Sequence, residues 1–269
     1  MKIRFQKAHG DGNDFLFTPA GDVPPGDTAE LARAICERHT GAGADGWYVV
    51  EGGDGDCDAA IRLYNSDGST AELSGNGTRC AAACLIEEGL AANDVRIMTG
   101  AGLRKLRLLE RNGLRFRLEM DMGAPSYREE EIRATLPLAS GNRDVTILDV
   151  GNPQCVVFVE EFDTDWLRTA REIEGHSRFP NRTNVAYVRV VDAHAVEARF
   201  FERGAGETRS SGTGSTGAAV AAILRKLVSS PVRVLTPAGE LGLRWGNTVW
   251  LAGPAEIIAR GEYYFEGAS

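Results

Sequence analysis

The sequence predicts an α+β protein made of two similar α/β halves, each a mixed β-sheet curled around a central helix. Three observations support this prediction. Short segments with alternating apolar residues outnumber convincing helices, two of the helices are rich in alanine and apolar almost all round, and loop-and-helix motifs recur at a nearly constant spacing. A helix without a polar face must be covered on every side, which a curled sheet achieves.

Length, composition and charge fit this arrangement. A chain of 269 residues is long enough for two domains that each bury a core, and 43% hydrophobic with 25% charged residues is typical of a globular protein. The formal net charge is −8 and lysines and arginines are scattered. We therefore expect neither nucleic acid nor a membrane as partner, but a small molecule.

The expected elements follow one another as short strands interrupted by a few helices. The alternating segments predict strands at 2–8, 60–65, 145–150, 155–159, 184–190 and 196–201. Helical patterns occur at 28–39, 76–89, 163–174 and 213–228. The second and fourth helices are the alanine-rich ones, and we expect each to be the central helix of its half.

The repeat is clearest where these two helices begin. The loop SGNG (74–77) precedes the first alanine-rich helix and SGTG (211–214) precedes the second, 137 residues later (211 − 74). Similar offsets separate two Gly-Asn pairs and two tight turns, and a polar residue stands nine positions before each loop serine: Gly12-Asn13 with Gly151-Asn152, Asn112-Gly113 with Gly246-Asn247, and Asn65 with Glu202. We therefore predict two homologous halves, 1–121 and 122–259, with residues from about 260 to 269 packing back on the first.

The paired loops indicate a ligand site. A loop of this kind places several backbone N–H groups at a helix N-terminus, which suits a carboxylate. If the halves face each other across a cleft, both helix ends hold one carboxylate, with Ser74 on one side of its α-carbon and Ser211 on the other. For a single loop the simpler interpretation is that its glycines close a tight turn, but the matched pair favours the ligand site.

Cysteine and histidine positions indicate neither disulfides nor metal. The five cysteines include no CxxC pair, and Cys80 and Cys84 lie four apart in a helical pattern, as small buried residues do. The four histidines are expected to be structural or exposed. With no apolar leader or membrane-spanning run, the expected location is the reducing cytoplasm.

Six motifs, in order along nearly the whole chain, resemble diaminopimelate epimerase. They are HGDGNDF (9–15), RHTGAGADG (38–46), RLYNSDGSTAELSGNGTRC (62–80), GNPQCVVFV (151–159), RTNVAYV (182–188) and ERGAGETRSSGTGSTGAA (202–219). The resemblance implies two pseudo-symmetric α/β halves around an interdomain cleft, no cofactor and a homodimer. The activity it implies is the interconversion of LL- and meso-diaminopimelate for lysine and peptidoglycan synthesis.

This sequence departs from the family at the catalytic positions. The family uses two cysteines, one on each face of the α-carbon, as base and acid, and they stand at the positions of Ser74 and Ser211. Gln154 stands where the family has a histidine, and Gly46 replaces a glutamine found in some members. A thiol has a pKa near 8.5 and an alcohol about 15.7, so the exchange opposes base formation by about 10 kcal/mol.

The substrate-binding positions are intact. The resemblance assigns the α-carboxylate to the backbone of Gly75, Asn76, Gly212 and Thr213, the distant amino-acid end to Asn65, Asn184, Glu202 and Arg203, and the cleft lining to Asn13 and Asn152. An adjacent Glu-Arg pair offers a carboxylate for an ammonium and a guanidinium for a carboxylate.

Four interpretations remain open from the sequence. The first is an epimerase inactivated by exchange of both cysteines for serine, and the second is a slow epimerase or an enzyme for a carbon acid that loses its proton more easily. The third is a non-catalytic homologue that binds diaminopimelate or another amino acid, and the fourth is an isomerase or dehydratase related to proline racemase. The Glu202-Arg203 pair speaks against the last, because a monoamino acid has no second zwitterion.

Overall fold

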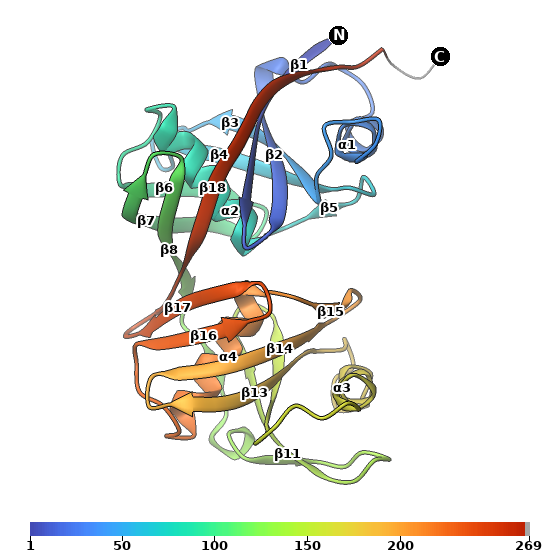
Figure 1. Ribbon diagram of the computed structural model, residues 1–269, viewed down its shortest axis with the longest axis vertical. Coiled ribbons are helices and arrows are strands. Elements are labelled where there is room, and N and C mark those ends of the chain that lie inside the picture. Colours follow the sequence, from blue (N-terminus) through green and yellow to red (C-terminus); the bar gives the residue numbers. More distant parts are fainter. Residues whose placement is uncertain (267–269) are drawn as a thin grey trace. The chain divides into compact units, whose positions relative to one another are not determined.

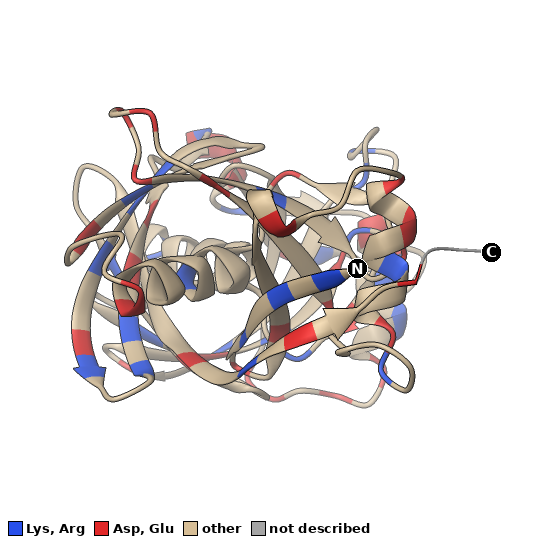
Figure 2. Ribbon diagram, turned by 90° about the horizontal axis from the view of Figure 1, so that it is seen from above, with Lys and Arg blue, Asp and Glu red and all other residues tan. Residues whose placement is uncertain are grey.

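The computed structural model describes residues 1–266 (Figure 1). They form an α+β fold in which strands far outnumber helices. Basic and acidic residues are interspersed along the strands and loops (Figure 2). In this described part of the chain, no helix combines the length and the apolar character needed to cross a membrane.

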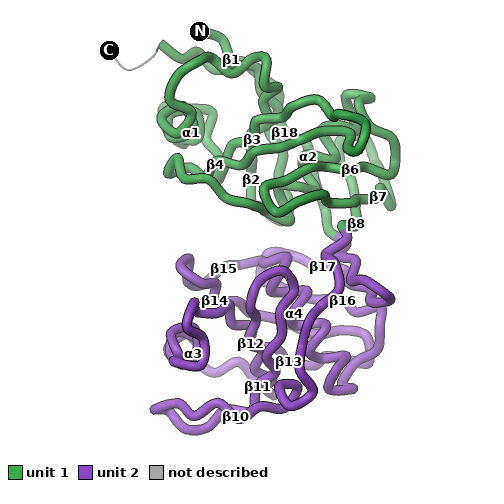
Figure 3. The backbone as a smooth tube through the Cα atoms, turned by 180° about the vertical axis from the view of Figure 1, so that it is seen from behind, with its two compact units in different colours: residues 1–120, 253–269 green, residues 121–252 purple. Residues whose placement is uncertain are grey.

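The chain forms two compact units, coloured green and purple in Figure 3. The first comprises residues 1–120 and the C-terminal segment from Gly253, and the second comprises residues 121–252. Strand β18 (Val249–Tyr264) belongs to both, because its first residues pair with β17 (Gly239–Trp245) and the part from Glu256 onward pairs with β1 (Lys2–Gly10). The C-terminal segment therefore joins the first unit at residue 253 rather than near 260.

The first unit is a sheet closed on itself around one helix. Its elements are β1, β2 (Asn13–Pro19), the 3-10 turn η1 (Ala20–Asp22), α1 (Thr28–Cys36), β3 (Gly46–Gly52), β4 (Ala59–Asn65), β5 (Thr70–Ala71), α2 (Gly75–Glu87), β6 (Asp94–Thr99), β7 (Gly102–Asn112) and β8 (Arg115–Gly123). Pairing runs β1-β2-β3-β4-β6-β7-β8-β18 and returns to β1, with β2·β3 and β4·β6 parallel. A closed sheet leaves no edge strand, and its interior holds α2.

The second unit repeats this plan. Its elements are β9 (Ser126–Tyr127), η2 (Glu129–Glu131), β10 (Ala134–Leu136), β11 (Arg143–Asp149), β12 (Pro153–Phe158), α3 (Trp166–Glu174), β13 (Asn184–Asp192), β14 (Ala195–Glu202), β15 (Gly206–Thr208), α4 (Gly212–Leu224), β16 (Val232–Thr236) and β17. The parallel pairs β12·β13 and β14·β16 correspond to β2·β3 and β4·β6. The internal repeat predicted from the sequence is confirmed.

The two central helices match in length, and each has 13 residues. In α4 the run Ala218–Ala222 is fully buried among strands of the second sheet, because alanines let the surrounding strands approach closely. Both helices end earlier than predicted, at Glu87 and Leu224 rather than 89 and 228. Left-handed backbone at Gly89 and Lys226, with φ of 72° and 60°, stops each one.

The outer helices differ from prediction at one end each. Helix α1 ends at Cys36 rather than 39, and its apolar side packs on a cluster that includes Leu16 and Trp47. Helix α3 begins at Trp166 rather than 163. The predicted Asn112-Gly113 turn does join β7 to β8, with φ of 60° at its glycine.

Candidate active site

Ser74 is the N-cap of α2 in the first unit. It has extended backbone (φ −126°, ψ 124°), and its Oγ accepts a hydrogen bond from the Gly77 N–H at 3.2 Å. The Thr78 N–H donates to the Ser74 carbonyl at 2.9 Å, as the first turn of the helix requires. The N–H groups of Gly75 and Asn76 precede these bonds and are left to bind another acceptor.

Ser211 caps α4 in the same way in the second unit. Its Oγ accepts from the Gly214 N–H at 3.0 Å, and its carbonyl accepts from the Ser215 N–H at 2.9 Å. The N–H groups of Gly212 and Thr213 are the equivalents of those in the first loop. Each unit thus presents the positive end of a helix dipole, capped by serine, to which a carboxylate can bind.

Aromatic rings explain why each loop ends in glycine. A Cβ placed on Gly77 would lie 2.2 Å from the Tyr48 hydroxyl, and one on Gly214 would lie 2.7 Å from the Phe200 ring. Both rings are buried. Burial raises the pKa of Tyr48, so its phenol stays protonated at neutral pH and supplies no base beside Ser74.

Ser211 has a charged partner that the sequence analysis did not assign to it. Its hydroxyl donates to Glu202 Oε1 at 2.5 Å, and the serine is 5% exposed. Glu202 is the last residue of β14, so the strand delivers its carboxylate beside the loop. A hydrogen bond to a carboxylate is stronger than a neutral one and orients the hydroxyl. Glu202 therefore contacts the serine that caps α4, whereas the resemblance assigns it to the distant end of a ligand.

Among the described residues all five cysteines are buried, so none offers an exposed thiol in place of the family's two cysteines. Cys80, six residues after Ser74, is fully buried in α2, and burial raises the pKa of its thiol to about 12. The prediction that Cys80 and Cys84 are small buried residues is confirmed. A thiol with this pKa is protonated at neutral pH, which leaves the two serines as the side chains at the helix ends.

Asn13 and Asn152 hold the hairpin turns of the two units against the loops. In the first unit the Asn76 side chain donates to Asn13 Oδ1 at 3.4 Å. In the second, the Asn152 side chain donates to Thr213 Oγ1 at 3.2 Å. Each of the two predicted asparagines therefore contacts the serine-capped loop of its own unit.

Gln154 is connected through Asn152 to the loop that carries Ser211. It is completely buried against Gly217, and its Nε2 donates to Asn152 Oδ1 at 2.6 Å. Its Oε1 has no hydrogen-bond partner among the described residues. An amide positions its neighbours but does not titrate, so this residue cannot relay a proton as a histidine does.

The remaining predicted residues, Asn65, Asn184 and Arg203, form hydrogen bonds to nearby loop and turn residues. Asn184 donates to the Pro153 carbonyl at 3.1 Å and accepts from the Arg203 backbone N–H at 3.0 Å. The Arg203 guanidinium donates to the Asn181 carbonyl at 3.1 Å. In the first unit Asn65 donates to Ser69 Oγ at 2.9 Å, between β4 and β5. Glu202 and Arg203 are successive residues with separate contacts, as expected at the end of a strand.

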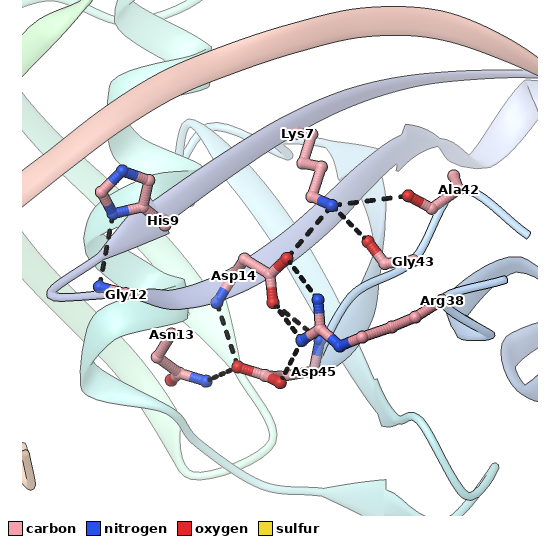
Figure 4. A network of polar contacts seen from close by, with 9 residues as sticks. All are labelled: Lys7, His9, Gly12, Asn13, Asp14, Arg38, Ala42, Gly43 and Asp45. Carbon is pink, nitrogen blue, oxygen red and sulfur yellow. Dashed lines mark hydrogen bonds and ion pairs between the residues drawn. The ribbon is translucent and has the colours of Figure 1, made fainter. Parts of the chain in front are cut away.

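A polar network fixes the segment that carries Asn13 (Figure 4). Asn13 donates to Asp45 at 2.6 Å, and Arg38 bridges Asp45 and Asp14 at 2.6 and 2.8 Å. Lys7 lies 3.1 Å from Asp14. Burial opposes ionisation of Asp14, but the hydrogen bonds and charges of Arg38 and Lys7 win and lower its pKa.

This network predicts a pH dependence of stability. The lowered pKa of Asp14 means that its contribution is fully present above the unfolded pKa of about 3.9 and is lost as pH falls through the folded pKa. Asp14→Asn should therefore lower the free energy of unfolding at pH 7 by roughly 1–3 kcal/mol. Urea unfolding from about pH 7 to about pH 2 should show a deficit that is constant down to about pH 4 and shrinks below it; a deficit that does not change below about pH 4 would contradict the assignment.

Arg79 is a buried residue beside the loop of Ser74 that was not predicted from the sequence. It is fully buried in α2, and its guanidinium donates to Asn76 Oδ1 at 2.5 Å. It therefore fixes the side chain that contacts Asn13. The only sequence signal was an arginine within an otherwise small and apolar helical stretch.

Among the described residues, no group of three or more His, Cys, Asp or Glu side chains is arranged to hold a metal ion.

Comparisons with known proteins agree with the motifs. The family model described as diaminopimelate epimerase matches residues 5–128 and 146–258. A protein named diaminopimelate epimerase from Nitrosospira multiformis is 40% identical over 276 residues, covering 97% of this chain and 98% of its own. One of the same name from Pelotomaculum thermopropionicum is 38% identical over 277 residues, covering 97% and 99%.

Solved structures with the same fold are more distant in sequence. A methylitaconate-delta-isomerase aligns with a TM-score of 0.72 at 15% identity, covering 98% of this chain and 95% of its own. A hydroxyproline epimerase from Agrobacterium vitis, with bound trans-4-hydroxy-L-proline, aligns with a TM-score of 0.69 at 18% identity, covering 97% and 92%. At this identity the likeness establishes the fold.

Proposed function

The chain belongs to the diaminopimelate epimerase family of isomerases, and from this premise we propose that it binds diaminopimelate and interconverts the LL and meso forms slowly, with Ser74 and Ser211 at the two base positions. The observation that carries the proposal is the pair of serine-capped helix N-termini, each with two N–H groups available to a carboxylate.

In the proposed reaction the two serines act on opposite faces of one α-carbon. In one direction Ser211 Oγ takes the α-proton while its own hydroxyl proton passes to Glu202, and the Ser74 hydroxyl delivers a proton to the other face. Negative charge that develops on the substrate carboxylate is stabilised by the N–H groups of the two helices. The alkoxide left on Ser74 is the costly species, so turnover is slow.

The other predicted residues complete the proposed site. Asn13 and Asn152 line it, and Asn65, Asn184 and Arg203 bind the end of the substrate that does not react. Glu202 lies beside Ser211 and so also suits the ammonium on the reacting carbon. We propose that the reaction needs no cofactor. Moving a proton at a carbon whose carboxylate is bound by backbone N–H groups requires only two acid-base groups.

A second candidate function is binding of diaminopimelate without proton exchange. The observation that favours it is Gln154, whose buried amide cannot carry a proton at the position of the family's histidine. The two functions share a ligand and differ only in chemistry.

The proposal is tested by calorimetry with LL- and meso-diaminopimelate and with lysine, followed by chiral separation after long incubation. We expect binding of both diaminopimelate isomers, much weaker binding of lysine, which lacks the second carboxylate, and slow conversion of LL to meso. Binding without conversion would support the second candidate, and failure to bind either isomer would contradict both.

We further propose that the protein acts in the cytoplasm as a homodimer, as its family resemblance suggests. Light scattering should then give a mass near twice the 28.9 kDa of one chain. A monomer mass at micromolar concentration would contradict the dimer.

A further inference from the structure

The first unit contains a cavity of about 700 Å³ at the end of α2 remote from Ser74. The helix contributes Ala81, Cys84, Leu85 and Glu88, and strands β1, β2, β3, β4 and β18 supply the other walls. With a rise of 1.5 Å per residue, Glu88 lies about 20 Å along the axis from Ser74. The cavity is therefore separate from the loop of the proposed active site, and its volume is that of a small-molecule site.

Much of its wall is apolar. Phe5, Phe17, Val50, Leu85 and Leu90 line it. Leu90 follows the C-terminal end of α2 and is 62% exposed, although its N–H donates to the carbonyl of the buried Leu85. An apolar body entering from solvent would cover such surface, and burying it contributes about 25 cal/mol per Å².

One buried polar atom in the wall lacks a partner. Gln6 is 8% exposed, and its Nε2 donates to Glu88 Oε1. Its Oε1 has no hydrogen-bond partner among the described residues. Turning the amide over would set its oxygen against the Glu88 carboxylate, so the observed orientation is the favourable one. The orphaned oxygen therefore calls for a donor from a ligand.

Charge at the same place favours a cation. Glu88 is the C-cap of α2, where the helix dipole is negative, and the last turn contains no basic residue. Arg4 and Arg260 also line the cavity, but Arg4 donates to Asp22 at 2.7 and 3.2 Å and Arg260 donates to Glu87 at 3.2 Å. Both arginines thus hydrogen-bond to carboxylates outside the cavity wall, and the charge of Arg4 also acts on Glu88 and Glu262 in the wall.

The second unit shows how the equivalent place is filled. Arg225 is the C-cap of α4, as Glu88 is of α2, and it is only 8% exposed. Its guanidinium donates to Thr146 Oγ1 at 2.7 Å and to Asp144 at 2.7 and 2.8 Å, and lies 4.9 Å from the Phe158 ring centroid. In the repeat, Asp144 and Thr146 on β11 correspond to Arg4 and Gln6 on β1. The second unit therefore fills this place with a cation of its own, paired with a carboxylate and lying beside an aromatic ring.

We propose that the cavity of the first unit binds a primary ammonium group carried on an apolar alkyl or aryl body. The ammonium donates to Gln6 Oε1 and to the Glu88 carboxylate, and the body packs between Phe5, Phe17 and Val50. The first unit has Glu88 where the second has Arg225, and Arg4 where the second has Asp144. Because Arg4 hydrogen-bonds to Asp22 and not to Glu88, the Glu88 carboxylate can accept a cation from a ligand.

Three probes of equal length test the charge preference: hexylammonium, hexan-1-ol and hexanoate, titrated into the whole protein by NMR or calorimetry. Hexylammonium should bind at least about tenfold more tightly than the alcohol, the equivalent of about 1.4 kcal/mol, and hexanoate should bind most weakly. Equal affinities, or tightest binding of hexanoate, would overturn the proposal.

Variants locate the site. Glu88→Gln should weaken hexylammonium at least about tenfold and leave hexanol unchanged, and Gln6→Met should give a smaller loss. Ala81→Phe, which adds a ring to the cavity, should weaken both probes. Glu72→Gln, an exposed carboxylate of the same unit, is the matched control and should change nothing. Full affinity in both Glu88→Gln and Gln6→Met, with native circular dichroism, would place the probe elsewhere and refute the assignment.

Discussion

Changing Ser74 and Ser211 together to cysteine is expected to accelerate the interconversion of LL- and meso-diaminopimelate at least about a thousandfold. The thiol pKa lies about 7 units below that of an alcohol, a difference of about 10 kcal/mol in forming the base, and only part of it needs to be recovered for this gain. Both positions are N-caps at positive helix ends, which further favour a thiolate. The measurement is the initial rate of meso formation by chiral separation.

The single variants separate the two positions. Ser74→Cys should give the larger gain of the two, because Ser211 already has Glu202 as a hydrogen-bond acceptor. Ser229→Cys, at an exposed serine beyond the C-terminal end of α4, is the control for adding a thiol and should have no effect. If the double variant binds diaminopimelate normally and is no faster than the native protein, the serines do not occupy the base positions.

Glu202→Gln is expected to lower the exchange rate of the native protein about a hundredfold. The amide keeps the size of the side chain but cannot accept the proton that the Ser211 hydroxyl donates across 2.5 Å. The same change should cost much less in the double cysteine variant, where a thiolate forms without that acceptor. Steady-state kinetics in both backgrounds provide the comparison.

Glu207→Gln, an exposed carboxylate on β15, is the matched control for loss of charge. An equal loss from Glu202→Gln in both backgrounds would mean that Glu202 only binds the substrate ammonium. In that case diaminopimelate affinity should fall with the rate, and the proton path through Glu202 would be wrong.

The features predicted correctly from the sequence are those encoded in local motifs. Serine is a preferred N-cap residue, so the two Ser-Gly-x-Gly loops at a fixed offset predicted both helix starts and the repeat. The Asn112-Gly113 turn was predicted equally well, because few residues other than glycine and asparagine adopt the left-handed backbone that it requires.

Features that depend on packing between distant segments were not predicted. The alternation of β18 predicts a hairpin with β17, which precedes it directly, but nothing in it shows that the strand continues along β1, which lies at the opposite end of the sequence. The helices were extended too far because apolar residues continue beyond the left-handed positions that stop them. The Ser211–Glu202 contact needed the register of β14 beside α4, although the nine-residue spacing from each loop serine was visible.

The cavity at Glu88 was also outside the reach of the sequence. The corresponding place in the second unit is filled by Arg225. The first unit carries Arg4 and Glu88 where the second carries Asp144 and Arg225, and these charges alone do not show whether space remains between the side chains. Only the side-chain directions of Arg4 and Gln6 decide that point.

The most direct test of the central claim is α-deuterium incorporation into LL-diaminopimelate by the native protein in deuterated water, followed by mass spectrometry, with Ser74→Ala, Ser211→Ala as the comparison. We expect slow, saturable incorporation by the native protein and none above background with the alanine double variant. Bound diaminopimelate that keeps its α-hydrogen in both proteins would contradict the claim that the two serines perform the family's proton exchange.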